Sequence, residues 1–169
     1  MSYLWILLPA VSCYVCCERR TMQTIQLSIL INAEKQTVWN ALHLQLNLRE
    51  RIAAFSNETF GESGYILKQT PWGDKILSHV VRHSPFEVVS IKHEAVLNDE
   101  QVDYWHPETK DWIGLYEIYR IRETKEQTVL YVEADCPGNH SEWIQHQIQE
   151  RLDQVKLISE QVTASIMHN

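Results

Sequence analysis

Apolar and polar residues alternate along most of the chain and change to a helical spacing near its C-terminus. From Asn139 to about Met167 the apolar residues recur at steps of three and four, which predicts one apolar stripe on an α-helix roughly 40 Å long. Pro137-Gly138 breaks the preceding element, Asn139 is the expected N-cap, and Glu142 is the expected capping-box carboxylate. The stripe comprises Trp143, Ile144, Ile148, Leu152, Val155, Ile158, Val162 and Ile166.

The clearest strand pattern lies at residues 24–31, where Ile25, Leu27, Ile29 and Ile31 recur at every second position. Asn32 is then the expected N-cap of a helix over residues 33–44, and a second short helix is predicted over 48–55. Five further strands are predicted over 65–69, 75–82, 87–94, 113–123 and 128–136. Strands and helices do not alternate in this order, which excludes a doubly wound parallel sheet. The pattern predicts an α+β fold, in which a curved antiparallel sheet is closed on its concave face by the final helix.

Residues 1–21 differ in composition from the rest of the chain. The segment from Tyr3 to Cys17 is almost wholly apolar but only about fifteen residues long, which is short of the roughly twenty that span a bilayer. No Lys or Arg precedes it, as a signal peptide would require. We interpret residues 1–21 as an extension outside a single domain at 22–169. A membrane anchor or export signal and a thiol function of Cys13 and Cys16 remain open alternatives, and membrane contact is expected only if this segment is an anchor.

The charge and cysteine content narrow the range of partners and compartments. The 169 residues carry a net charge of −7 and contain no run rich in Lys and Arg, so we expect no nucleic-acid partner. Only Cys136 lies in the predicted domain, which therefore cannot form an internal disulfide. This arrangement favours a reducing compartment and predicts a cytoplasmic protein.

Four segments together resemble a known superfamily. They are the strand of residues 23–33 leading into Val38-Trp39, the segment from Asp111 to Tyr119 with its Trp-x-Gly-x-x-Glu-x-Tyr pattern, the strand from Thr128, and the long terminal helix. Over residues 22–166 the sequence resembles the START-like, or SRPBCC, helix-grip superfamily, and within it the branch named for the activator of the heat-shock-protein-ninety ATPase. The resemblance implies a helix-grip fold with an internal hydrophobic cavity. It does not imply one chemistry, because the superfamily includes lipid carriers, polyketide cyclases, stress proteins and co-chaperone domains.

The motifs of common enzymes and metal sites are missing from the sequence. There is no phosphate-binding loop, and Gly61-Glu62-Ser63-Gly64 lacks the spacing of a nucleophile elbow. His79 and His83 share a predicted strand, where four residues at ~3.3 Å each place them roughly 13 Å apart. We therefore predict neither a metal ion nor a cofactor.

Three polar residues are predicted to face the core. If Val89 and Ile91 point inward, period two places His93 on the same face, and likewise Leu115 and Ile121 bring Glu117 and Tyr119 inward. A carboxylate on an apolar face is costly unless it is paired or protonated. We hypothesise that Glu117, with His93 or Tyr119, forms a polar spot that orients a ligand or acts as an acid or base. A structural hydrogen-bonded pair is the alternative.

The resulting hypothesis is that the protein binds a small hydrophobic molecule in a cavity. Whether it is also an enzyme is uncertain, and the sequence leans against an enzyme. The alternatives are a co-chaperone-like interaction module with a chaperone partner, and a cyclase- or hydrolase-like enzyme using Glu117 and His93. Three tryptophans are expected near strand ends, where they either line the mouth of the cavity or pack at its rim: Trp72, Trp105 and Trp112. The predicted lining consists of Ile29, Ile31, Val89, Ile91, His93, Leu115, Glu117, Tyr119, Leu130, Val132, Ile148, Leu152 and Val155.

Overall fold

The structure is a computed structural model that describes residues 22–46, 48, 65–69, 75–98, 101–103, 110–125 and 127–167. The N-terminal extension of residues 1–21 lies outside the described residues. The predicted second helix does too, apart from Leu48, which is helical and buried.

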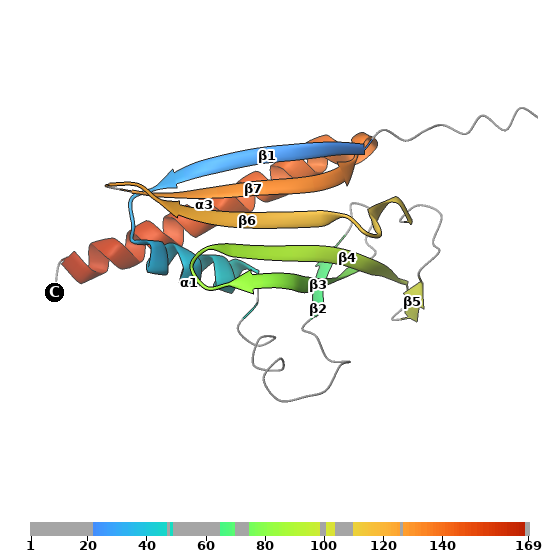
Figure 1. Cartoon of the computed structure of the whole chain (residues 1–169), viewed down its shortest axis with the longest axis horizontal. Helices are drawn as coiled ribbons and strands as arrows, with labels where there is room; N and C mark the ends of the chain where they lie inside the picture. The colour runs from blue at the N-terminus through green and yellow to red at the C-terminus, as the bar shows by residue number, and fades with distance from the viewer. Residues whose placement is uncertain are drawn as a thin grey trace, which may run out of the picture.

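The described residues form a seven-stranded antiparallel sheet and two helices (Figure 1). The strand order is β1-β7-β6-β4-β3-β2, and β5 pairs with β4. This confirms the predicted α+β fold, and it adds β5 and two 3₁₀ turns at Lys110–Trp112 and Gly138–His140. The elements are β1 (Met22–Ile31), α1 (Lys35–Gln45), β2 (Tyr65–Gln69), β3 (Lys75–Ser84), β4 (Val88–Asn98), β5 (Gln101–Asp103), β6 (Tyr116–Glu123), β7 (Thr128–Pro137) and α3 (Ser141–Met167).

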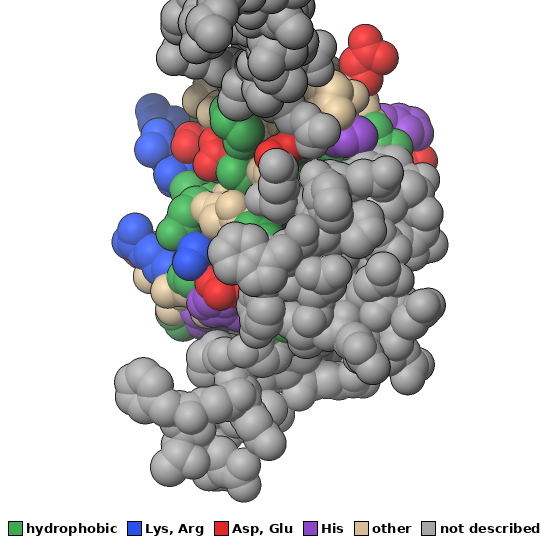
Figure 2. Space-filling view, turned by 90° about the vertical axis from the view of Figure 1, so that its right-hand side faces the viewer, with side chains coloured by type: hydrophobic (Ala, Val, Ile, Leu, Met, Phe, Trp, Pro, Cys, Tyr) green, Lys and Arg blue, Asp and Glu red, His purple; other side chains and the backbone are tan. Residues whose placement is uncertain are grey.

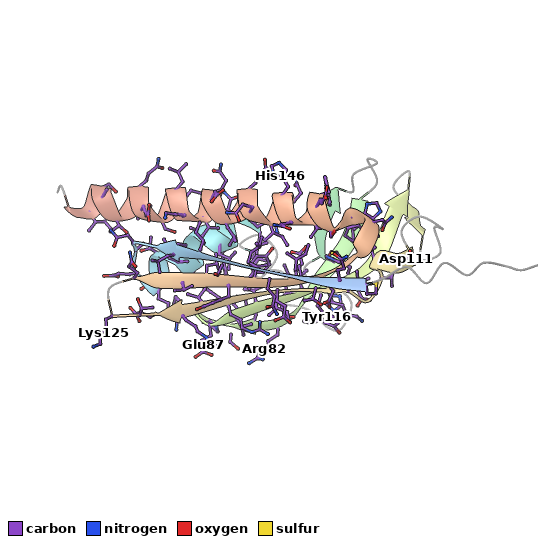
Figure 3. The ribbon with its side chains drawn as sticks, turned by 90° about the horizontal axis from the view of Figure 1, so that it is seen from above. Arg82, Glu87, Asp111, Tyr116, Lys125 and His146 are labelled. Carbon is purple, nitrogen blue, oxygen red and sulfur yellow. The ribbon has the colours of Figure 1, made fainter. Side chains whose placement is uncertain are left out.

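Both helices lie on one side of the sheet, as Figure 3 shows from above. The stripe of α3 supplies the centre of the core, where Ile148, Leu152 and Val155 are at most 2% exposed. Period two also holds in β7, where Leu130 and Val132 are buried while Tyr131 between them is exposed. Of the described helices, none has the length and apolar character needed to cross a membrane.

Two predicted helix caps are wrong. The helix α1 begins at Lys35 after Glu34, and the backbone N–H of Asn32 instead donates to Glu160 of α3 over 3.0 Å. Asn139 lies in the 3₁₀ turn before α3, where its side-chain amide contacts the ring of His140 at 3.1 Å. Asn32 is followed by a bend and the extended Glu34, and Asn139 lies within the 3₁₀ turn, so each expected capping residue lies too early.

The last turns of α3 extend past the sheet toward the C-terminus (Figure 1). Val162 is 42% exposed and Ile166 is 68% exposed, although both belong to the predicted apolar stripe. The stripe is therefore longer than the sheet surface that covers it.

The outer face of the sheet, turned away from both helices, carries charged and aromatic side chains. Figure 3 shows Arg82, Glu87 and Tyr116 projecting from this face. Arg120 pairs with Glu133 at 3.3 Å. In Figure 2, Lys and Arg side chains lie beside Asp and Glu side chains at the left-hand edge, with hydrophobic side chains between them. The mixture of charges identifies this side as a solvent-exposed face.

Replacing Leu152 by Ala should lower the free energy of unfolding by about 2–5 kcal/mol, because it removes a fully buried side chain at the centre of the α3 stripe. Leu157 on the same helix is 50% exposed, so Leu157→Ala serves as a matched control and should cost less than about 1 kcal/mol. Urea denaturation followed by circular dichroism measures both values. Equal losses in the two variants would contradict the assigned orientation of α3.

Candidate functional site

The three polar residues predicted to face the core are buried there. His93 is 2% exposed, Glu117 is 4% exposed and Tyr119 is fully buried. Their apolar neighbours Val89, Ile91 and Ile121 are buried as well, so the predicted inward faces of β4 and β6 have the correct phase. The site is thus a polar patch inside an apolar core.

Two irregularities in the sheet place His93 within this patch. A register shift between Leu77 and Ser78 sets Ser78 of β3 opposite His93 of β4, as bulges often do when they redirect a side chain. On the other side of β4, the backbone of His93 bonds Leu115 and Gly114 where the chain enters β6. Gly114 has a φ of +87°, which side chains rarely allow, so a glycine suits this entry turn.

A chain of polar contacts runs across the strands from β3 to β6. Ser78 Oγ lies 2.7 Å from His93 Nδ1, and both side chains are buried. His93 Nε2 lies 3.7 Å from Glu117 Oε1, which is an electrostatic contact rather than a hydrogen bond. Tyr119 donates its hydroxyl hydrogen to Glu117 Oε2 over 2.8 Å. The carboxylate therefore has a polar neighbour at each oxygen.

Arg151 of α3 completes the patch from the helix side. Its Nη1 donates to Tyr119 and lies 3.4 Å from Glu117 Oε2, and its guanidinium carbon lies 5.9 Å from the centre of the Tyr119 ring. The buried charge of Glu117 is thus balanced by a cation that is itself only 20% exposed. We call the set Ser78, His93, Glu117, Tyr119 and Arg151 the buried network.

Arg151 and Ser78 were missed by the sequence reasoning. Arg151 does not belong to the apolar stripe, yet it lies three residues after Ile148 and four before Val155. That spacing places it at the edge of the core-facing stripe, so a signal was available. Ser78 had no such signal, because its position opposite His93 depends on the register shift.

Burial and charge together fix the protonation of Tyr119 and Arg151. Burial raises the pKa of Tyr119 and outweighs the opposing effect of Arg151. The pKa of Arg151 is raised in turn by Tyr119 and by Glu117. Tyr119 is therefore a neutral donor at physiological pH, and Arg151 stays a cation beside the carboxylate.

Arg151 also connects the network with the molecular surface. It lines a surface hollow of about 570 Å³ between the C-terminal end of α1 and α3. The other lining residues are polar, namely Gln45, Gln147, Glu150, Asp153 and Gln154. One side of the guanidinium thus faces the interior network, and the residue as a whole reaches the surface.

The remaining predicted site residues have mixed outcomes. Leu115 is half-buried just before β6 and accepts a hydrogen bond from the His93 N–H over 2.9 Å. Trp112 is 1% exposed and packs edge-on to Trp143 of α3, with ring centres 6.4 Å apart, so it belongs to the core rather than to a cavity mouth. Trp72 and Trp105 lie outside the described residues.

The network has the composition of an acid–base or nucleophilic site but lacks the access of one. Ser78, His93 and Glu117 follow one another in the order of a serine triad. Ser78 is fully buried, however, and the contact from His93 to Glu117 is too long for a hydrogen bond. Within the described part of the chain, no group of three or more His, Cys, Asp or Glu side chains is placed to hold a metal ion. What the network offers is a set of preorganised donors around one buried charge.

Comparison with known proteins identifies the fold. No family model and no curated protein matches this sequence. Among solved structures, the Aha1 dimer from Colwellia psychrerythraea superposes with a TM-score of 0.56 at 16% identity, over 82% of this chain and 96% of that one. Protein MLL2253 from Mesorhizobium loti gives 0.57 at 14% identity, over 82% and 98%. The chain has the helix-grip fold.

A third helix-grip neighbour is the di-domain ARO/CYC protein StfQ from the steffimycin biosynthetic pathway. It superposes with a TM-score of 0.57 at 13% identity, over 86% of this chain and 54% of that one. The resemblance seen in the sequence is thereby confirmed at the level of the fold. Identities this low carry no residue roles from one helix-grip protein to another.

Replacing Arg151 by Met should destabilise the protein by about 3 kcal/mol at pH 7, because Glu117 keeps its buried charge and loses its cation. Adding Glu117→Gln to this variant should restore part of the loss, since the uncompensated charge is then gone. Arg122→Met on the outer face is the matched control and should change stability by less than about 1 kcal/mol. Urea denaturation of the parent, Arg151→Met, Glu117→Gln and the double variant gives the coupling. Strictly additive effects would show that Arg151 and Glu117 do not act as a pair.

Proposed function

We propose that this helix-grip domain binds a small hydrophobic molecule between the sheet and α3, with the molecule's polar end held by the buried network. The single observation that carries the proposal is the charge of Glu117, buried on the apolar inner face of the sheet and paired with the partly exposed Arg151. A buried ion pair is a weak source of stability, because hydrophobic residues of similar volume often stabilise a core as well or better. Its presence therefore favours a role in recognition.

The donors of Arg151 indicate which polar end the ligand would present. Within the described part, the hydrogen bonds of Arg151 all come from Nη1. A guanidinium has five N–H donors in a fixed plane, so further donors remain for a ligand. A carbonyl, carboxylate or hydroxyl oxygen on an otherwise apolar molecule is the matching group. The surface hollow beside Arg151 supports an approach of such a group from the side of α3.

The interaction module is the second candidate, and one comparison favours it. The solved neighbours include the Aha1 dimer, whose fold this chain shares along most of its length. On this reading the functional surface is the outer face of the sheet, where Tyr116 and Tyr131 are more than one-third exposed, and a chaperone is the expected partner. A cytoplasmic location stays a prediction under either function.

Native mass spectrometry of the full chain, purified from a native-like host, tests the ligand directly. We expect an adduct of a few hundred daltons that is lost on denaturation. A bare mass, together with capture of a chaperone that depends on Tyr116 and Tyr131, would replace the ligand-binding proposal by the interaction module.

Glu117→Gln tests the site itself. The variant removes the charge that orients Tyr119 and Arg151, so it should weaken binding of the extracted molecule about tenfold or more, since a hydrogen bond to a charged group is worth about 1.5–3 kcal/mol. Glu123→Gln makes the same change at an exposed position of β6 and should leave the affinity unchanged. Calorimetric titration measures both. A variant that loses stability but binds with unchanged affinity would give the network a purely structural role.

A further inference from the structure

A second polar group lies where α1 meets the turn between β3 and β4, away from the buried network. His43 of α1 is 8% exposed, and His83 near the end of β3 is exposed to solvent. Their Nε2 atoms lie 3.2 Å apart, although the residues are forty positions apart in the sequence. The function proposed above uses neither side chain. The two imidazole rings therefore form a candidate binding site.

The geometry points to a shared metal ion: we propose that His43 and His83 bind one divalent transition-metal ion of the zinc or copper type. A tetrahedral ion holds each imidazole nitrogen at about 2.0–2.1 Å, which places two such nitrogens about 3.3–3.4 Å apart. The observed 3.2 Å is close to that separation. The ring centres are 5.1 Å apart, so both rings direct their Nε2 atoms toward one region between them.

In the metal-free pair, one Nε2 donates a hydrogen that the other Nε2 accepts. To bind an ion, the donor ring moves its proton from Nε2 to Nδ1, and both Nε2 lone pairs then face the metal. Both rings stay neutral through this exchange, so no proton is lost in the balance. Neutral imidazole is a favoured ligand of zinc, copper and nickel.

Aromatic side chains hold the two rings in place. The ring of Trp39 lies 4.3 Å from that of His43 and 5.2 Å from that of His83, measured between centres. The ring of Phe86 lies 5.8 Å from that of Trp39, measured between centres, and Phe86 has a φ of +63°, which a bulky side chain rarely adopts. Such strain persists only where the surroundings enforce it, and it is common at ligand sites. The pair is thus preorganised rather than placed by two free side chains.

Among the described residues, the site has two protein ligands. No third His, Cys, Asp or Glu side chain of the described ranges completes the set. Because His83 is exposed, water would occupy the remaining positions of a bound ion. The ion would join α1 to the β3–β4 turn, and its open positions would accept a small oxygen or nitrogen ligand.

Titration of the full chain with zinc chloride by calorimetry tests the proposal. The protein is first treated with iodoacetamide, which blocks Cys13, Cys16 and Cys17. We expect saturable binding of one ion per chain, weakened at least tenfold by His83→Asn and by His43→Gln. His79→Asn and His146→Asn are matched controls, since these histidines pair with Glu94 and Glu150 instead, and should bind as the parent does.

Copper chloride gives an independent readout through Trp39, which contacts both rings. Saturating copper should quench part of the tryptophan fluorescence in the parent protein and in the His79 and His146 variants, and should quench less in His83→Asn. Because His83 is exposed, that variant decides the question even if His43→Gln fails to fold. Binding that is unchanged in His83→Asn, or no saturable binding in the parent up to millimolar zinc, would overturn the proposal.

Discussion

The helix α3 buries Ile148, Leu152 and Val155 against the sheet, and this contact closes the concave side of the molecule. The helices α3 and α1 cover the inner faces of β6 and β7. These faces are therefore shielded from solvent only while α3 stays in place. Two polar links fix its far end. Lys156 Nζ donates to the carbonyl of Leu30, and the N–H of Asn32 donates to Glu160. The apolar contact supplies the stability, and the polar links set where along the sheet the helix lies.

The buried network adds a constraint of a different kind. Glu117 lies on the inner face of β6, where an unpaired charge would be expensive. Only one rotation of α3 about its axis directs Arg151 to that carboxylate. Apolar packing tolerates small slips of a helix, whereas a buried charge pair does not, and buried polar groups fix register in other folds. The same residues thus define how α3 is placed and which polar groups a ligand between α3 and the sheet would contact.

The sequence pattern predicts much of this architecture because period two and the helical spacing are local. The inward placement of His93, Glu117 and Tyr119 follows from their apolar neighbours on the same strand. Ser78 could not be placed this way, because a register shift decides which residue faces His93. His43 and His83 meet only through tertiary packing, and no spacing within one element reports such a pair. Arg151 differs from these, because its position at the edge of the stripe can be deduced from the spacing, whereas its charge argues against burial.

The sheet pairs two strands that lie far apart in the sequence, and this has a consequence for how the protein is made. In β1, Met22 pairs with Pro137 of β7, and Ile31 pairs with Thr128. The strand β1 therefore leaves the ribosome before its partner β7, by about 5 to 20 s at usual rates of synthesis of 5–20 residues per second. Its alternating apolar residues stay without their partner strand during that time. Contacts this distant in sequence also slow folding, so β1 is the strand most exposed to wrong pairing in the nascent chain.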